Sequence, residues 1–315
     1  MVLGTLFLAG CQTKPTPPPV VSVPAPVVVE RTEDLIIVAG QPFHTGTRVV
    51  TWRDPDGFNA YDFVPTPQAG KENHGERRLS TDESVPSPQL WDLAALQGFV
   101  DQFVLHYDSE AFSYRTFPIL QKRGLSAHFL LDVDGTLYQT LDLRERAYHA
   151  TVANSRAIGI EIANPGAYPL AKAKVLAARY ETGATGEIQQ RFAENDRVLT
   201  EGFVARPDRA GVVVGNINGS VVRQYDFTPE QYAALIKLTA ALHRIFPRIA
   251  LDYPRDPGGR LITKKLSDET REKFQGVLGH FHIQANKIDP GPAFQWERVI
   301  KGARKIDAPA KAPIK

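Results

Sequence analysis

The sequence predicts a mixed α/β or α+β domain, because short apolar strands are interspersed with helices instead of following strict βαβ repeats. Three observations support this fold class. Residues 103–107 and 158–162 are short apolar runs typical of strands. The dipeptides Asp134-Gly135 and Asn218-Gly219 each stand between apolar runs, which predicts two hairpins with two-residue turns. Thr228 begins an amphipathic pattern that predicts a long helix.

The N-terminal part of the folded region has a different character. Residues 34–64 alternate short apolar runs with turn residues and predict a few short strands. Residues 65–88 are polar and contain Pro, Gly and charged residues, which is typical of a loop or a boundary. We therefore expect residues 34–88 to be a small β extension of a main domain at residues 89–303.

The first half of the main domain continues the pattern of strands and helices. Residues 114–123 have a helical distribution of apolar side chains, and Gly124 is a suitable stop. The first hairpin and the strand at 158–162 follow. Residues 165–210 show weak periodicity, and we expect them to be an insertion that borders the functional cleft.

The long helix after the second hairpin has the strongest local signals. Thr228 can cap it, Pro229 suits the first helical position, and Gln231 completes a capping box. Pro247 should end the helix.

The sequence ends with a shorter helix and a tail. Ser267 is a suitable cap for a helix with Asp268 and Glu269 in its first turn. Residues 304–315 are basic and rich in Pro and Ala, so we expect a disordered tail.

Composition excludes some classes of protein. The 315 residues are 43% hydrophobic and 23% charged, an ordinary globular balance. The formal net charge is only +2 and no basic stripe is present, so a nucleic-acid partner is not expected. Cys11 is the single cysteine, which excludes an intrachain disulfide.

Residues 1–11 resemble a bacterial lipobox, in which the cysteine becomes the lipidated first residue of the mature protein. Cys11 follows Leu8-Ala9-Gly10 and an apolar run that is too short to span a bilayer. Residues 2–10 contain no Lys or Arg, although secretory signals begin with a positive region. A start codon upstream of Met1 is a hypothesis that upstream DNA would test, and an accidental apolar N-terminus is the alternative.

The lipobox reading predicts the location of the protein. Acyl chains on Cys11 would anchor it to a membrane. Residues 12–33 are rich in proline and predict an extended polyproline II linker of about 3.1 Å per residue. Gln12 resembles the residue that follows the cysteine in lipoproteins sorted to the outer membrane. We therefore expect a lipid-anchored protein that faces the periplasm from the outer membrane.

Residues 279–292 contain the densest group of chemically useful side chains. They include, in order, His280, His282, Lys287 and Asp289. Catalytic zinc binds N and O donors, typically through three protein ligands with one open position. His106 ends a predicted strand, where a rigid backbone can present a further imidazole to a cleft.

Five short motifs, in order along residues 101–300, carry a resemblance to a known family. They are Val104-Leu105-His106-Tyr107, Ser126-Ala127-His128-Phe129, Ala147-Tyr148-His149-Ala150, Ile158-Gly159-Ile160-Glu161, and Gly279-His280 with Asp289-Pro290-Gly291-Pro292. The chain resembles the zinc N-acetylmuramoyl-L-alanine amidases, a family shared by bacterial amidases, phage amidases and peptidoglycan recognition proteins. The resemblance implies a central mixed β-sheet flanked by helices.

The resemblance also implies the roles of individual residues. Zinc would be bound by His106, His280 and Asp289. Glu161 corresponds to the acid/base glutamate of the family, and Lys287 to its cationic catalytic residue.

Three more aromatic residues have expected places around this site. Tyr148 and His149 are expected to line the substrate cleft. His128 lies within an apolar strand, where a structural hydrogen-bonding role is expected.

His282 departs from the family pattern, which commonly has aspartate at this position. Three readings stay open for it: a group that supports a ligand, a surface residue, or an alternative ligand if the loop shifts register. The spacing from His280 to Asp289 is also one residue shorter than in many relatives.

Two hypotheses about function follow. The first is a zinc-dependent amidase that hydrolyses the bond between N-acetylmuramic acid and L-alanine in peptidoglycan or in (anhydro)muropeptides, during cell-wall degradation or recycling. The second is a peptidoglycan-binding module without turnover, which would normally lack a metal ligand.

Overall fold

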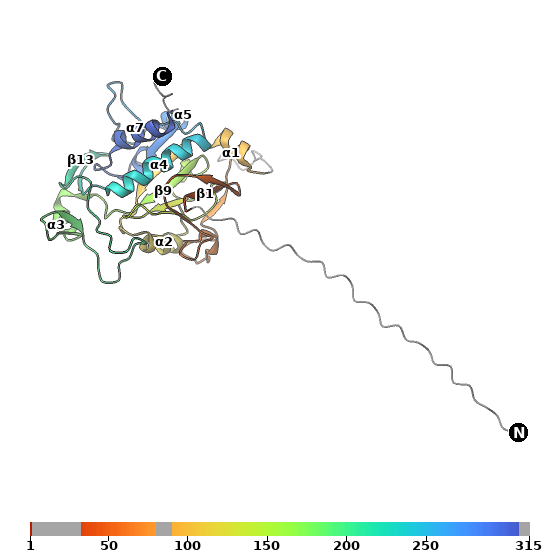
Figure 1. Ribbon diagram of the computed structural model, residues 1–315. Helices are drawn as coiled ribbons and strands as arrows, with labels where there is room; N and C mark the ends of the chain where they lie inside the picture. The colour runs from red at the N-terminus through yellow and green to blue at the C-terminus, as the bar shows by residue number, and fades with distance from the viewer. Residues whose placement is uncertain (2–32, 80–89, 309–315) are drawn as a thin grey trace, which may run out of the picture. The chain divides into compact units, whose positions relative to one another are not determined.

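A six-stranded mixed sheet forms the centre of the computed structural model, which describes residue 1, residues 33–79 and residues 90–308 (Figure 1). Cys11 and residues 12–32 of the predicted linker lie outside the described residues. The strands stand in the order β15 (Gly276–Gly279), β5 (Gln102–Tyr107), β9 (Ala157–Ile162), β6 (Phe129–Leu131), β7 (Leu137–Gln139) and β3 (Val49–Thr51). The first four are parallel, β7 is antiparallel to β6, and β3 is parallel to β7. The expected central mixed sheet is therefore present.

Helices cover both faces of this sheet, as its parallel part requires. Phe103, Leu105 and Ile160 share one apolar cluster with Leu235 and Leu238 of α4 (Pro229–Ile245). On the other face, Leu130 packs with Leu120 of α2 (Ser113–Lys122). Figure 1 shows α4 and α2 on opposite sides of β9. His106 and Glu161 alternate with these core residues and so belong to the α2 face.

Helix α4 forms as the sequence predicts. Thr228 Oγ accepts the N–H of Gln231, and the Gln231 side chain accepts the N–H of Thr228, completing the capping box. The last helix, α7 (Trp296–Asp307), packs against α4, where Gly302 allows close approach to Ile236.

The predicted tail at 304–315 is wrong in its first residues, because α7 continues to Asp307. Val299, Ile300 and Ala303 are buried, so the apolar face extends this helix into the basic segment.

The two predicted hairpins differ in their turns. Ile217 pairs directly with Ser220, so the turn between β13 (Val213–Ile217) and β14 (Ser220–Gln224) has the predicted two residues. In the other hairpin, the Asp132 N–H bonds to the Thr136 carbonyl at 2.9 Å. That loop has three residues, with Gly135 at φ +82°, the usual alternative when a turn is followed by a left-handed residue.

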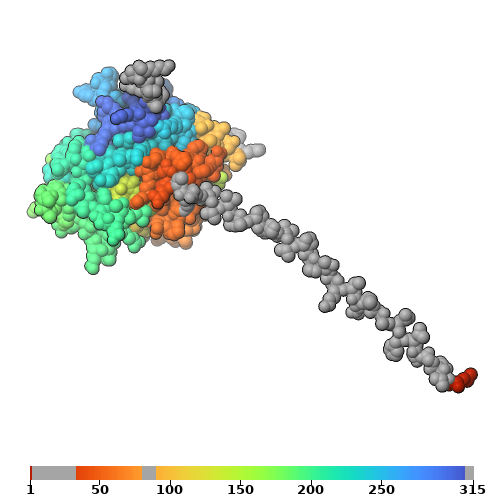
Figure 2. Space-filling view, viewed as in Figure 1, coloured from red at the N-terminus to blue at the C-terminus, as the bar shows by residue number. Residues whose placement is uncertain are grey.

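One strand of the predicted N-terminal extension joins the central sheet. β1 (Leu35–Val38) and β2 (Gln41–His44) form a hairpin, and β3 adds an edge strand to β7. Residues 60–62 are a 3₁₀ turn instead of part of the expected strands. Figure 2 shows residues 33–79 as an orange surface continuous with the neighbouring parts of the fold.

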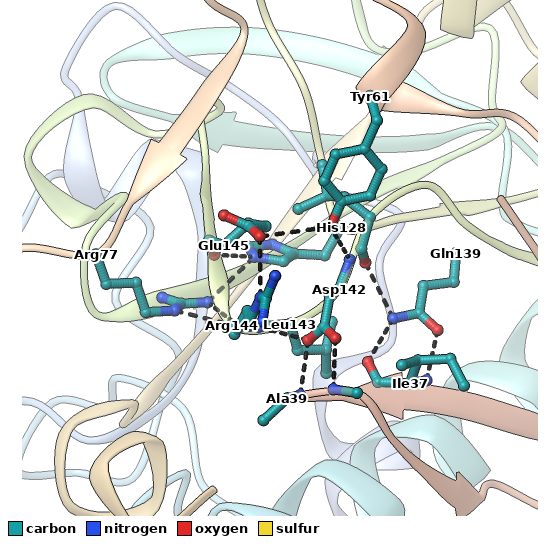
Figure 3. Close-up of polar contacts among 12 residues, drawn as sticks. Ile37, Ala39, Tyr61, Arg77, His128, Gln139, Asp142, Leu143, Arg144 and Glu145 are labelled. Carbon is teal, nitrogen blue, oxygen red and sulfur yellow. Dashed lines mark hydrogen bonds and ion pairs between the residues drawn. The ribbon is translucent and has the colours of Figure 1, made fainter. Parts of the chain in front are cut away.

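Side chains fasten this extension to the segment at 139–145 (Figure 3). The Gln139 amide accepts the Ile37 N–H and donates to the Ile37 carbonyl, both at 2.8 Å. Asp142 accepts the N–H groups of Ala39 and Gly40, each at 2.7 Å. These buried bonds replace water and tie the β1–β2 turn to the main domain.

Arg77 comes from the predicted polar loop but is fully buried. Its guanidinium donates to the carbonyls of Leu143 at 2.8 Å, Ser155 at 2.7 Å and Ala157 at 3.1 Å. Burial lowers the pKa of Arg77 to about 9, so it stays charged at neutral pH. A buried cation with several carbonyl partners is costly to lose, because those acceptors would be left unpaired.

The remaining elements surround this core. The segment at 165–210 holds β10 (Tyr168–Pro169), η3 (Leu170–Lys172), α3 (Ala173–Ala177), β11 (Tyr180–Thr182) and β12 (Ile188–Gln190). Elsewhere lie η1 (Ala60–Asp62), β4 (His74–Glu76), α1 (Leu93–Phe99), β8 (Glu145–Ala147), η2 (Thr151–Ala153), α5 (Asp268–Lys273) and α6 (His280–Ile283). Among the described residues, no helix is long and apolar enough to cross a bilayer.

Candidate active site

Three neighbouring parallel strands bring the central site residues into one row. His106 of β5 pairs directly with Glu161 of β9. On the other side of β5, Gly279 of β15 pairs with Leu105, so His280 is the next residue beside His106. Side chains at equivalent positions of adjacent strands point the same way. Residues that are far apart in sequence therefore meet at the carboxyl ends of the strands, where α/β sheets commonly bind ligands.

Asp289 completes a cluster with the two histidines. Its Oδ2 lies 2.9 Å from His106 Nδ1 and 3.1 Å from His280 Nδ1. The two imidazole rings meet edge to face with centroids 4.5 Å apart. One donor atom from each residue lies within 4.8 Å of the others. The structure thus gathers the three predicted ligands into a possible metal site.

The other ring nitrogens of both histidines have partners that fix the ring orientation. His106 Nε2 lies 3.0 Å from His149 Nδ1, and His280 Nε2 lies 2.5 Å from Gln284 Oε1. Gln284 Oε1 can only accept, so the Nε2–H of His280 donates to it, and this bond orients the ring with Nδ1 toward Asp289. Metal-binding histidines are commonly oriented by such a second hydrogen bond.

The protonation states suit a cation. Burial, followed by the proximity of His280, lowers the pKa of His106 to about 4, so its imidazole is neutral at pH 7. Burial alone would raise the pKa of Asp289, but the bonds to His106 and His280 outweigh it and hold that pKa well below its ordinary value. A neutral imidazole and an ionised carboxylate are the states in which these two groups bind metal.

The donor set fits zinc. Zinc bonds of about 2.0–2.2 Å in a tetrahedron place two ligand atoms about 3.4 Å apart. The nitrogen–oxygen separations of 2.9 and 3.1 Å are close to this value. Two imidazoles and one carboxylate also leave a fourth position for a reacting group, as in catalytic zinc sites.

A cleft of about 370 Å³ opens over this cluster. Its walls include Tyr148, His149, Glu161 and Lys287. Burial, followed by the charge of Asp289, raises the pKa of Glu161 well above its ordinary value, and Lys287 opposes this shift. A carboxyl group shifted toward neutral pH is suited to accept a proton and return it.

His149 is held tightly on the floor of the cleft. Its ring packs against Gly159 of β9, where an added Cβ would lie 2.6 Å from three ring atoms. Its Nδ1 faces His106, and its Nε2 is buried with no partner among the described residues. Only glycine at position 159 leaves room for this ring, which explains a glycine inside a central strand.

His128 has the structural role expected of it. It is fully buried, its Nδ1 accepts the Gly159 N–H at 3.0 Å, and its Nε2 donates to the Glu145 carbonyl at 3.0 Å (Figure 3). The Arg77 guanidinium lies 3.1 Å from the same Nε2 but can only donate, so the two groups form no hydrogen bond. The nearby positive charge disfavours protonation of the imidazole. Burial, with Arg77 beside it, lowers the pKa of His128 well below its ordinary value.

His282 is buried, and both of its ring nitrogens bond to backbone groups and not to the ligand cluster. Its Nδ1 accepts the Gly279 N–H at 2.9 Å, and its Nε2 donates to the Ile262 carbonyl at 2.7 Å. Both ring nitrogens of His282 are therefore hydrogen-bonded to the backbone, and neither is free to bind a metal. Of the three open readings, the one the geometry favours is a group that supports a ligand, because this bond closes the first turn of the helix that begins with His280.

Among the described residues, none of the insertion at 165–210 lines the cleft itself, although Gly166 packs against Tyr107 and Ser109, which do. Among the described residues, the cleft walls come from 106–125, 148–161 and 280–289. The insertion packs on the start of α2 instead, with the rings of Phe192 and Phe112 4.8 Å apart. Phe192, Phe203 and Ala205 of the insertion are buried or partly buried in that apolar cluster.

A family model decides the identity of this fold. Residues 96–292 match the Amidase_2 model, described as N-acetylmuramoyl-L-alanine amidase, and this span is more than half of the chain. The chain belongs to the N-acetylmuramoyl-L-alanine amidase family. It is an enzyme, and the reaction class is hydrolysis of an amide bond of peptidoglycan.

Solved structures of similar proteins are distant from this amidase. The endolysin amidase LysCS from Clostridium intestinale URNW has 14% identity and a TM-score of 0.37, covering 82% of this chain and 95% of its own. AmiD from E. coli, solved with anhydro-N-acetylmuramic acid-L-Ala-D-γ-Glu-L-Lys, has 16% identity and a TM-score of 0.37, covering 73% and 65%. An AmpD structure has 18% identity and a TM-score of 0.31, covering 80% and 96%. No curated protein matches the chain.

All the predicted site residues except Cys11, which lies outside the described residues, line this cleft. The structure also adds residues that the sequence did not indicate. Gln284 stands four residues after His280, and that helical spacing is a signal that could have identified it. Gly159 could have been noticed as a glycine inside an apolar strand.

Proposed function

We propose that this amidase binds zinc through His106, His280 and Asp289 and hydrolyses the bond between N-acetylmuramic acid and L-alanine. The observation that supports this most is the strand register, which pairs His106 with Glu161 and ends β15 at Gly279, directly before His280. This arrangement places a proton acceptor directly beside a metal site. Zinc, when bound, supplies Lewis-acid chemistry: it activates water near neutral pH and polarises a carbonyl.

Glu161 is the proposed proton carrier. Its carboxylate accepts the proton of the attacking water and then gives it to the nitrogen of the leaving L-alanine amine. The raised pKa of Glu161 supports the first half of this transfer, because it makes the carboxylate a stronger proton acceptor. Its rigid position on β9 keeps the transfer distance fixed.

Lys287 is the proposed electrostatic partner. Its side chain lines the same cleft as Glu161 and Asp289, and its charge acts on the pKa of Glu161. An ammonium at this place stabilises negative charge as it develops on the carbonyl oxygen of the scissile amide. Tyr148 and His149 form the neighbouring wall, where the substrate is positioned.

The proposed substrates are peptidoglycan and its soluble (anhydro)muropeptides, in wall degradation or recycling. The cleft is open and its lining is mixed, with Asp108, Arg123 and Asn286 among its polar side chains beside the catalytic groups. The charged and amide side chains of this lining can bind a sugar and a charged stem peptide. AmiD is a relative solved with a ligand of this class.

The test incubates purified protein lacking residues 1–31 with intact sacculi, soluble muropeptides and anhydro-muropeptides. Free stem peptide is measured by mass spectrometry with zinc, with chelator, and after zinc is restored. We expect release with zinc only, and the best of the three substrates identifies the physiological class. Absence of release under every zinc condition would refute the catalytic assignment and favour a binding module.

We also propose that Cys11 carries a lipid that anchors the protein to the outer membrane, facing the periplasm. Support comes from the lipobox-like residues 8–11 and the proline-rich segment after them. The test expresses the full chain and its Cys11→Ala variant with an upstream signal and measures membrane fractionation and the mass of the N-terminal peptide. A cysteine without acyl groups in the membrane fraction would contradict the anchor.

A further inference from the structure

The hairpin β13–β14 contacts the segment that carries half of the active site. Residues 279–292 have little regular structure of their own: α6 has four residues, and Lys287 and Asp289 follow it on irregular backbone. A segment of this kind keeps a fixed shape only if other parts of the chain satisfy its backbone. The hairpin supplies these contacts from more than sixty residues away in sequence.

Asn218, at the tip of the hairpin, gathers three carbonyls of this segment. Its Nδ2 lies 3.1 Å from the Phe281 carbonyl, 3.3 Å from the Gln284 carbonyl and 2.9 Å from the Lys287 carbonyl. Its Oδ1 accepts the Lys265 N–H at 2.7 Å. One amide side chain therefore connects the backbone of α6 to the backbone of Lys287, two residues before Asp289.

The base of the same hairpin holds the other end of the segment. Gln224 is fully buried, donates to the Pro290 carbonyl at 3.1 Å and accepts the Ala293 N–H at 3.1 Å. Between the two ends, Gly215 lies against Pro292, where an added Cβ would be 2.6 Å from the proline Cβ. The hairpin thus touches the segment on both sides of Asp289.

We propose that Asn218 is a positioning residue of this amidase, which fixes the backbone that carries Lys287 and Asp289. Asn218 reaches neither the cleft nor a ligand atom; it acts through the carbonyls of Phe281, Gln284 and Lys287. Gln284 is the hydrogen-bond partner of His280, so the same contact also fixes the orientation of that ring. The expected effect of Asn218 on catalysis rests on the proposed function, whereas its effect on the backbone at 281–287 does not.

The test compares two substitutions of Asn218 with a matched control. Asn218→Asp keeps the size, the left-handed backbone at φ +49° and the acceptor for Lys265, but removes the NH2 group that the three carbonyls share. Asn218→Gly keeps the turn and removes the side chain. Asn216→Asp makes the same change of charge at an exposed position of the same hairpin.

Three measurements are made on the full-length protein: amide hydrogen exchange of residues 280–290 without metal, zinc affinity by chelator competition, and kcat and KM for a muropeptide. For Asn218→Asp we expect faster exchange, zinc affinity about 10-fold weaker, and kcat about 10–100-fold lower with KM within about threefold. Asn216→Asp should match the wild type in all three. A role in stability alone would lower the melting temperature and leave kcat of the folded enzyme unchanged.

Folded Asn218→Asp with exchange, zinc affinity and kcat within twofold of wild type would overturn the proposal. If Asn218→Asp does not fold, Asn218→Gly is judged by the same criteria, and failure of both to fold would also overturn it, because Asn218 would then serve the fold and not the site. A wild type that releases no peptide would instead refute the proposed function, while hydrogen exchange still decides whether the hairpin fixes the segment.

Discussion

The two halves of the active site are held in place by different means. The strand half, His106 and Glu161, stands on adjacent central strands whose backbone ladder fixes the side chains together. The loop half, His280, Lys287 and Asp289, follows the end of β15 and depends on single side chains for its shape. Many backbone hydrogen bonds hold the strands, so we expect substitutions in the strand half to remove a catalytic or ligand group without moving the backbone. Substitutions around the loop half should instead change the geometry of the site.

The largest effect is expected in the strand half, from His106→Ala. It removes one of three ligands on a rigid scaffold, so zinc binding should be lost and peptide release should fall by at least about 10³-fold. Bound zinc is measured by mass spectrometry after gel filtration. His44→Ala, at an exposed histidine, is the control. A folded His106→Ala protein that keeps one equivalent of zinc would show that the ligand set is wrong.

Glu161→Gln should separate metal binding from catalysis. The amide cannot accept the proton of water, so kcat should fall about 10²–10⁴-fold while zinc stays bound. Glu76→Gln, an exposed position on β4, should have no effect. Steady-state release of stem peptide measures kcat of both variants, and mass spectrometry measures their bound zinc. Activity within tenfold of wild type would assign the proton transfer to another group.

Gly159→Ala tests how closely the strand half is packed. The new Cβ would overlap the ring of His149 and displace the partner of His106, and overpacking of this kind costs about 1–3 kcal/mol. Zinc affinity should weaken about tenfold, because His106 loses its second hydrogen bond. Gly98→Ala in α1, with open space around it, should be neutral or stabilising. Equal unfolding curves for the two variants would show that the His149 ring is free to move.

The smallest effect is expected in the loop half, from His282→Gln in metal-free protein. Loss of two buried backbone bonds should destabilise it by about 1–3 kcal/mol at pH 7. Burial lowers the pKa of His282 to about 3, so below pH 6.5 the unfolded state binds a proton that the folded state does not. The contribution of His282 is therefore full above pH 6.5 and is lost as the pH falls toward 3.

The difference between wild type and His282→Gln should consequently shrink by up to about 2 kcal/mol from pH 7 to pH 5. Urea unfolding at both pH values measures it. A difference that stays constant with pH would mean that His282 is protonated in the folded state.

The strand half was the more predictable from sequence. His106 and Glu161 stand in short apolar strands with local signals, and the motif order along the chain pointed to their roles. Their meeting in one row depends on strand register, which joins residues more than fifty positions apart and has no local signature. The family match supports the enzyme class that these residues suggested.

The loop half was less predictable, because its partners are distant in sequence. Asn218 was predicted only as a turn residue, and that prediction is confirmed. Nothing in the sequence around it indicates that its amide also binds the backbone at 281–287. The environment of His282 likewise needed the position of Ile262, twenty residues away.

The boundary of the domain could not be predicted for a similar reason. The parallel pairing of β3 with β7 joins residues about ninety positions apart, so residues 34–64 looked like a separate extension. The end of α7 was missed because its charged residues resemble a tail, and only the packing of Ala303 on the fold shows that the helix continues.

The edge position of β3 has a practical consequence for anyone preparing shorter forms of this enzyme. A fragment cut at residue 96, where the family match begins, would discard β3 and Arg77 together. The N–H and C=O groups of β7 would then face solvent as a fresh edge, and such an edge readily pairs with another copy of the chain. The carbonyls of Leu143, Ser155 and Ala157 would lose their cation. The smallest piece that stays soluble should therefore begin before residue 34.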